Sequence, residues 1–75
     1  MVSKGYENCL LVMRRLKEEW VLKTIDRNPL RRIIVDVTEI AHPPSVGGII
    51  NALVDAGFLE RIDNYTYKIL KYEKD

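Results

Sequence analysis

The sequence holds few of the residues on which disulfide frameworks, metal sites and membrane spans depend. Its 75 residues include one cysteine and one histidine. Cys9 therefore cannot form a disulfide within the chain, and a zinc site of Cys and His ligands is not expected. No apolar run approaches the roughly 18 residues of a membrane-spanning helix, and residues 1–5 do not resemble the start of a signal peptide. We therefore expect a cytoplasmic protein with no cofactor.

Catalytic groups are equally scarce. His42 has no serine or carboxylate partner at a spacing that would build a catalytic set. The chain also lacks a glycine-rich phosphate loop and a pair of carboxylates expected to face the same interior site. We expect no enzymatic activity from this sequence.

Basic residues are missing from the middle of the chain. Residues 1–32 carry eight basic and four acidic side chains, a net charge of +4, whereas residues 33–58 contain no lysine or arginine and have a net charge of −3. Residues 59–75 balance at zero, and the whole chain carries +1. Attraction for a polyanion such as nucleic acid must therefore come from the segments before and after the middle.

Apolar spacing predicts two helices in the first half of the chain. Residues 6–25 carry apolar side chains at helical spacing, which predicts a first helix. Asn28-Pro29 is a typical helix start, because Asn caps the first turn and Pro needs no amide partner there. The apolar spacing that follows predicts a second helix over about residues 29–41. Residues 33–37 are rich in β-branched side chains and would also suit a short strand.

The second half of the sequence predicts a third helix and a hairpin. His42-Pro43-Pro44 ends the second helix, because a residue that precedes proline avoids helical angles. Ser45 can cap a third helix over about residues 45–56, and Gly57 supplies a left-handed stop. Residues 59–71 then predict two strands around Asp63-Asn64, whose residue types are typical of a two-residue hairpin turn.

Three segments resemble the winged helix-turn-helix superfamily of prokaryotic and archaeal regulators. They are Thr38-Glu39-Ile40-Ala41, then Ser45 with the apolar positions up to Leu53, then Asp55-Ala56-Gly57-Phe58-Leu59-Glu60-Arg61. In that family these segments correspond to the positioning helix, the capped recognition helix and the exit into the wing. The resemblance implies a single domain over residues 1–75, of the α+β class and mostly α, with three helices followed by a two-stranded hairpin wing. It also implies double-stranded DNA as a partner and a role in transcription regulation.

The sequence departs from that family's pattern at two points. The link between Ala41 and Ser45 is shorter than usual, and the third helix presents glycines, Asn51 and Asp55 in place of the usual Arg, Lys, Gln, Ser or Thr. Direct reading of base edges needs bidentate groups, and Asn51 is the one such group on this helix. We therefore expect the third helix to contribute shape, and the phosphate contacts to come from outside it.

The candidate DNA-binding residues fall into three groups. Arginines ahead of the motif suit phosphates, which supply affinity and register but no sequence information. Glycines on the third helix allow close approach of a duplex or partner helix, pack closely within the domain, or belong to a first turn that frays. Basic side chains of the hairpin suit the DNA backbone. The full set is Arg27, Arg31, Arg32, Ser45, Gly47, Gly48, Asn51, Arg61 and Lys68.

Two hypotheses about partners follow. In the first, the domain binds DNA as a homodimer, because one copy offers few basic contacts, and two third helices then lie about one duplex turn apart. In the second, the domain is a protein-interaction module of a transcription, replication or processing complex, with little DNA affinity of its own. The segment without basic residues favours the second hypothesis. The expected dimer surface on the first helix is Tyr6, Leu10, Met13 and Trp20.

Overall fold

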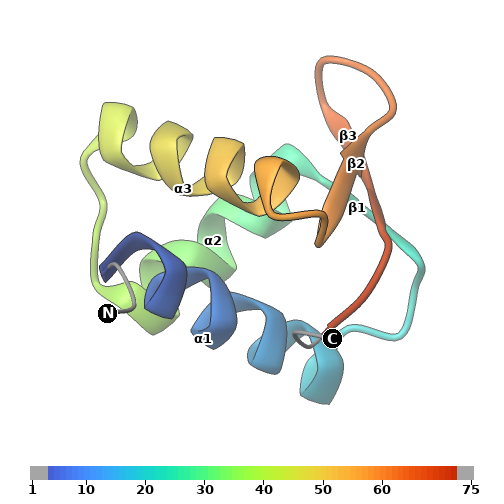
Figure 1. Ribbon diagram of the computed structural model, residues 1–75, viewed down its shortest axis with the longest axis horizontal. Helices are drawn as coiled ribbons and strands as arrows, with labels where there is room; N and C mark the ends of the chain where they lie inside the picture. The colour runs from blue at the N-terminus through green and yellow to red at the C-terminus, as the bar shows by residue number, and fades with distance from the viewer. Residues whose placement is uncertain (1–3, 73–75) are drawn as a thin grey trace.

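Three helices and three short strands make up residues 4–72, the part of the chain that the computed structural model describes (Figure 1). The fold is α+β and mostly helical, as the sequence predicts. Among the described residues, no helix is both long enough and apolar enough to cross a membrane. The elements in chain order are α1 (Lys4–Glu19), β1 (Thr24–Asp26), α2 (Arg27–Thr38), α3 (Pro43–Asp55), β2 (Leu59–Arg61) and β3 (Thr66–Ile69).

The strands form one antiparallel sheet in the order β1-β3-β2. β3 lies in the middle, and Tyr67 at its centre pairs with Ile25 of β1 on one side and Arg61 of β2 on the other. The predicted hairpin over about residues 59–71 is present as β2 and β3, but the sequence did not predict β1, which adds a third strand to the sheet. Figure 1 shows the turn between β2 and β3 extending beyond the end of α3.

The first helix is shorter than its apolar spacing predicts. α1 ends at Glu19, not near residue 25, and Ile25 is buried on β1 instead. Val21 is exposed in the turn between the two elements. The indole Nε1–H of Trp20 donates to the carbonyl of Thr24 at 2.9 Å, which closes this turn. The helix prediction overran because apolar residues of a helix end and of a short strand give the same hydrophobic signal over a few positions.

The second helix follows its predicted apolar pattern, with Leu30 and Ile34 fully buried. The strand alternative for residues 33–37 is therefore wrong. α2 begins at Arg27 rather than at Asn28-Pro29, because β1 leads directly into it.

α2 ends at Thr38, before residue 41 and before the His42-Pro43-Pro44 stop that the sequence predicts, and it ends in an unfavourable backbone conformation. Its C-cap residue Glu39 has φ 60° and ψ 16°, the one positive φ among the described non-glycine residues, and its N–H donates to the carbonyl of Val35 at 2.9 Å. The left-handed region costs a residue with a Cβ roughly 1–2 kcal/mol. Glycine adopts the same conformation readily.

We expect Glu39→Gly to raise the free energy of unfolding by about 1 kcal/mol, because it removes the conflict between the Cβ and the backbone. Urea unfolding followed by circular dichroism measures the change. Glu39→Ala removes the carboxylate and keeps the Cβ, so this control should not stabilise the domain. If the Glu39→Gly protein is no more stable than the Glu39→Ala protein, the left-handed conformation at residue 39 is not strained.

The third helix begins earlier than predicted. α3 starts at Pro43, and His42 rather than Ser45 occupies the N-cap position. The first helical positions tolerate Pro43 and Pro44 because their missing N–H groups would have no partner there. The prediction of a Ser45 cap is wrong for this reason: the prolines already fit the first turn.

The predicted stop at Gly57 is confirmed. Gly57 has φ 83° and its N–H donates to the carbonyl of Val54, while the N–H of Phe58 donates to the carbonyl of Leu53. These two bonds form the Schellman arrangement that ends many helices. The chain then passes directly into β2.

The hairpin turn is longer than the predicted pair Asp63-Asn64. Residues 62–65 separate β2 from β3. The Asp63 carboxylate accepts a hydrogen bond from the backbone N–H of Tyr65 at 2.8 Å, which holds the turn in a compact form. The prediction of a two-residue turn is therefore wrong.

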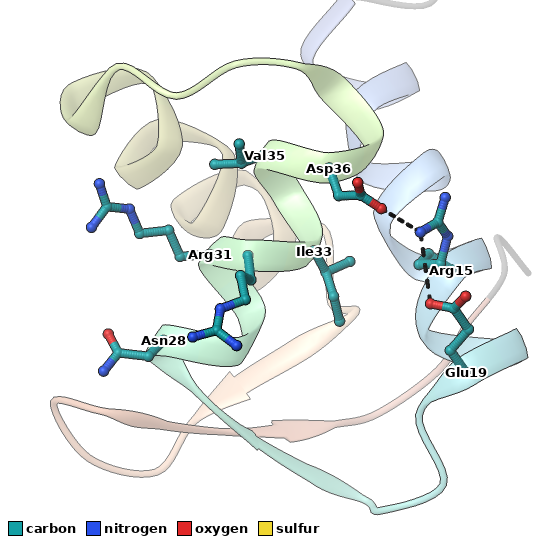
Figure 2. Close-up of a pocket in the computed structure, with 8 residues that line it drawn as sticks. Arg15, Glu19, Asn28, Arg31, Ile33, Val35 and Asp36 are labelled. Carbon is teal, nitrogen blue, oxygen red and sulfur yellow. Dashed lines mark hydrogen bonds and ion pairs between the residues drawn. The ribbon is translucent and has the colours of Figure 1, made fainter.

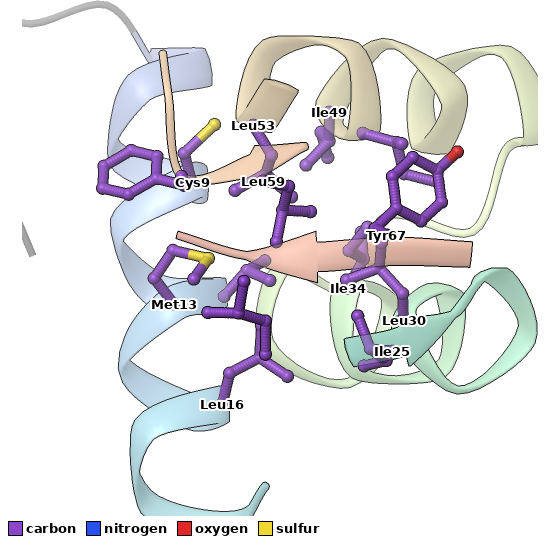
Figure 3. Close-up of a cluster of buried hydrophobic side chains, with 14 of the residues drawn as sticks. Cys9, Met13, Leu16, Ile25, Leu30, Ile34, Ile49, Leu53, Leu59 and Tyr67 are labelled. Atoms are coloured by element: carbon purple, nitrogen blue, oxygen red, sulfur yellow. The ribbon is translucent and has the colours of Figure 1, made fainter. Parts of the chain in front are cut away.

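One hydrophobic core joins all six elements (Figure 3). Its members come from one face of each helix and from the inner face of the sheet. Among the described residues it contains no charged or purely polar side chain. The buried residues are Cys9, Val12, Met13, Leu16, Ile25, Leu30, Ile34, Val46, Ile49, Ile50, Leu53, Phe58, Leu59, Tyr67 and Ile69.

Candidate functional site

A groove of about 290 Å³ lies between α3 and the inner face of the sheet. Residues from the start of α2, from α3 and from both hairpin strands line it, and none of these lining residues is acidic. We call it the α3 groove. Its lining residues are Arg27, Gly47, Ile50, Asn51, Arg61 and Tyr67.

Different contacts position the two arginines of the α3 groove. Arg27 is the first residue of α2, and its backbone N–H donates to the carbonyl of Tyr65 at 2.7 Å, which ties the helix start to the hairpin. Arg61 ends β2, and its guanidinium carbon lies 5.8 Å from the centre of the Tyr67 ring, within the range of a cation–π contact. Both side chains are exposed, so the positive charge of the groove faces solvent.

Asn51 is the amide that α3 brings to the groove. Its Oδ1 accepts a long hydrogen bond, 3.4 Å, from Nη2 of Arg61. An amide that reads adenine uses both its oxygen and its nitrogen. In this structure the Asn51 oxygen is already bonded to Arg61. Asn51 would therefore have to break that bond before its side chain could read a base.

Tyr67 is absent from the candidates that the sequence suggests. Its side chain is 1% exposed, on the core side of β3. Figure 3 shows its hydroxyl at the edge of the core cluster, pointing away from the other side chains. No described residue forms a hydrogen bond with that hydroxyl. Strand alternation identifies Tyr67 as a core residue, but the place where its hydroxyl emerges depends on how α3 packs over the sheet.

Gly47 and Gly48 leave part of the outer surface of α3 bare. A Cβ added to either glycine would meet nothing within 4 Å. Close packing within the domain therefore does not explain these glycines. A fraying first turn does not explain them either, because α3 begins at Pro43 and both glycines lie beyond its first turn. Each costs the helix roughly 1 kcal/mol relative to alanine, and close approach by an external partner stays a prediction.

Arg31 and Arg32 lie outside the α3 groove, on a pocket of about 620 Å³ between α1 and α2 (Figure 2). Carboxylates share this pocket. Nη1 of Arg15 lies 2.5 Å from Asp36 and 3.7 Å from Glu19. The hydrogen bond to Asp36, and after it the charge of Glu19, raise the pKa of Arg15. These acids reduce the positive charge of the surface, which makes it a weaker site for a polyanion than the α3 groove.

Lys68 and Ser45 also lie outside the groove. Lys68 is exposed between two buried residues of β3, so it faces the opposite side of the sheet, where Glu60 is its partner in the strand register. The Oγ of Ser45 lies 3.5 Å from Nδ1 of His42 at the start of α3. The predicted DNA-binding residues that do meet in the α3 groove are Arg27, Gly47, Asn51 and Arg61.

The expected dimer surface on α1 is only partly accessible. Met13 is completely buried in the core of its own domain, so it offers no surface to a second copy in this structure. Tyr6, Leu10 and Trp20 are half-buried and pack against that core. Assembly through α1 stays a prediction, with less apolar area than the sequence suggests.

Residues 4–72 contain no group of three His, Cys, Asp or Glu side chains placed to hold a metal ion. The one thiol, Cys9, is buried, and burial raises its pKa.

No family model, curated protein or solved structure matches this chain. The α3 groove is therefore the feature of this structure that bears most directly on function.

Proposed function

We propose that this domain is a winged helix-turn-helix protein that binds double-stranded DNA, and that it serves as a transcriptional regulator. The observation that carries the proposal is the α3 groove, which Arg27 from α2 and Arg61 from β2 both line, beside the bare glycine surface of α3. Such a surface offers positive charge at its edge and close approach at its centre. Both properties suit a helix that lies against a duplex.

The element order supports the winged-helix part of the proposal. A helix, a short strand, two helices and a hairpin follow one another, and only residues 39–42 separate α2 from α3. In this assignment α3 is the recognition helix, the β2–β3 hairpin is the wing, and residues 62–65 form its tip. β1 pairs with β3 on the side away from β2, which anchors the wing to the start of α2.

The α3 groove suits contact with the DNA backbone better than reading of bases. Its charged groups are arginines that reach solvent, and its one amide, Asn51, already contacts Arg61. Phosphate contacts set register and affinity without sequence information. We therefore infer modest sequence preference and marked dependence on salt.

The test is a salt titration of binding to a labelled mixed-sequence duplex, measured by fluorescence anisotropy. Binding should weaken steeply with salt, because each phosphate contact releases bound counterions. Arg27→Ala combined with Arg61→Ala should lower the magnitude of the slope of log affinity against log salt by about 0.9 per arginine. A folded protein that shows no binding even at low salt would rule out the proposed function.

Arg31→Ala combined with Arg32→Ala is the charge-matched control. It removes the same charge from the pocket between α1 and α2, outside the α3 groove. The control should keep a slope close to that of the unmodified protein. If both double variants lower the slope of log affinity against log salt by the same amount, the attraction for DNA is spread over the whole surface and the α3 groove is not the binding site.

One observation favours a second candidate function, that of a protein-interaction module. α3 has no basic residue, and the charged residue on its exposed surface is Asp55. A partner protein could pack closely over Gly47 and Gly48 without any need for positive charge there. Folded protein that fails to bind duplex at low salt would favour this function over the first.

A further inference from the structure

The Tyr67 hydroxyl is a polar group that the fold holds in place and that no other described residue contacts by a hydrogen bond. The side chain is 1% exposed, its ring is fixed by the core, and the guanidinium of Arg61 lies 5.8 Å from the ring centre. No hydrogen bond joins the hydroxyl to another residue among 4–72, and because no buried side-chain polar atom there lacks a partner, the hydroxyl is open to solvent. A ligand that accepts a hydrogen bond from it would therefore not have to immobilise the side chain, which lowers the entropic cost of binding.

The side chains that line the α3 groove are mainly hydrogen-bond donors. Arg27 and Arg61 can only donate, and the one amide oxygen, of Asn51, faces Arg61. Base edges present donors as well as acceptors, whereas a backbone phosphate presents acceptor oxygens. A lining of donors with two positive charges matches a phosphate group better than a base.

Two carboxylates that lie close in sequence to the groove arginines have hydrogen-bond partners of their own. Oδ1 of Asp26 accepts a hydrogen bond from the Thr66 hydroxyl at 3.2 Å, and Oδ1 of Asp63 accepts one from the Tyr65 backbone N–H at 2.8 Å. Neither aspartate lines the groove. Within the described part of the chain, no acid in the lining balances the two arginines.

We propose that the α3 groove holds one phosphate group of a nucleic-acid backbone, with the Tyr67 hydroxyl donating a hydrogen bond to it and Arg27 and Arg61 supplying the charge. This assignment rests on the proposed function and adds a defined anchor to it. A phosphate held beside Gly47 fixes the position of α3 along the duplex. The contact carries no information about base sequence.

Tyr67→Phe tests the assignment, because it removes the hydroxyl and keeps the ring in the core. Affinity for the duplex should fall roughly tenfold, the effect of losing one hydrogen bond to a charged group. The slope of log affinity against log salt should stay unchanged, because a neutral hydroxyl releases no counterion. The thermal unfolding midpoint should also stay unchanged or rise slightly, because the hydroxyl has no partner within the described structure. Tyr65→Phe is the control: it removes an exposed hydroxyl two residues earlier and should leave affinity as it is.

The loss caused by Tyr67→Phe should be the same on duplexes of unrelated sequence. If Tyr67→Phe lowers the affinity about tenfold on every duplex and Tyr65→Phe leaves the affinity unchanged, the phosphate assignment is supported. A loss confined to some sequences would assign Tyr67 to a base edge and overturn it. Equal affinity of the Tyr67→Phe protein and the unmodified protein would overturn the assignment and leave the proposed function standing. Absence of duplex binding by the unmodified, folded protein would overturn both.

Discussion

Replacing Phe58 by alanine is expected to lower the free energy of unfolding by about 3–5 kcal/mol, the usual range for loss of a buried aromatic ring. Phe58 is 1% exposed, its ring centre lies 6.3 Å from that of Tyr6, and Nζ of Lys71 lies 5.3 Å above it. Its backbone N–H donates to Leu53 and its carbonyl accepts from Leu70. The side chain therefore fills the junction of α1, the end of α3 and the sheet.

Such a loss is comparable to the whole stability of a domain this small. At roughly 0.05–0.15 kcal/mol per residue, a chain of 75 residues has about 4–11 kcal/mol in total. We therefore expect the Phe58→Ala protein to be partly unfolded at 25 °C. Urea unfolding followed by the fluorescence of Trp20 measures the loss.

Leu11→Ala is the control for this measurement. Leu11 lies on the exposed side of α1 with 45% of its surface accessible, and substitutions at such positions usually change stability by less than about 0.5 kcal/mol. A Phe58→Ala protein only as destabilised as this control would contradict the position of Phe58 in the core.

Local sequence signals predicted the second half of the chain better than the first. The stop at Gly57 depends on one residue with positive φ and on bonds to the preceding turn, so the local sequence is sufficient. β1 is different, because its partner β3 lies about forty positions further along the chain, as in the pair Ile25 and Tyr67. A strand of three residues has too few positions for its own alternation to be recognised.

The sequence predicted those residues of the candidate site that are polar or that belong to the winged-helix motif. Arg27, Gly47, Asn51 and Arg61 were all identified, and the fold brings them together. Charge alone could not separate Arg27 from Arg31, because the two differ only in which surface of α2 they occupy. The same limit applies to Tyr67, whose ring belongs to the core while its hydroxyl reaches the groove.

Replacing both Gly47 and Gly48 by alanine is expected to stabilise the domain and weaken its binding to DNA. Both glycines lie inside α3, and an added Cβ meets nothing within 4 Å. Each alanine should add roughly 1 kcal/mol to the free energy of unfolding. For a domain of this size, the pair should raise the melting temperature by roughly 8–16 °C, which differential scanning calorimetry measures.

Gly57→Ala is the matched control, because it makes the same chemical change at a position of different backbone conformation. An added Cβ at Gly57 would make only ordinary contacts with Lys71, the nearest at 3.9 Å, so space is not the limit there. The φ of 83° is the limit, and alanine in the left-handed region should lower stability by roughly 1–2 kcal/mol. If alanine raises the free energy of unfolding at Gly47 and Gly48 and lowers it at Gly57, the fold does not require the two glycines of α3.

The binding measurement then decides why α3 keeps its two glycines. If a duplex approaches the bare backbone at Gly47 and Gly48, two methyl groups hold it away from Arg27 and Arg61. Affinity should then fall by roughly an order of magnitude, equivalent to about 1.4 kcal/mol of lost contact. A variant that melts higher and binds duplex as well as the unmodified protein would contradict close approach at this surface. A variant with a higher melting temperature and a lower affinity for duplex would show that the two glycines lower the stability of α3 and strengthen its contact with DNA.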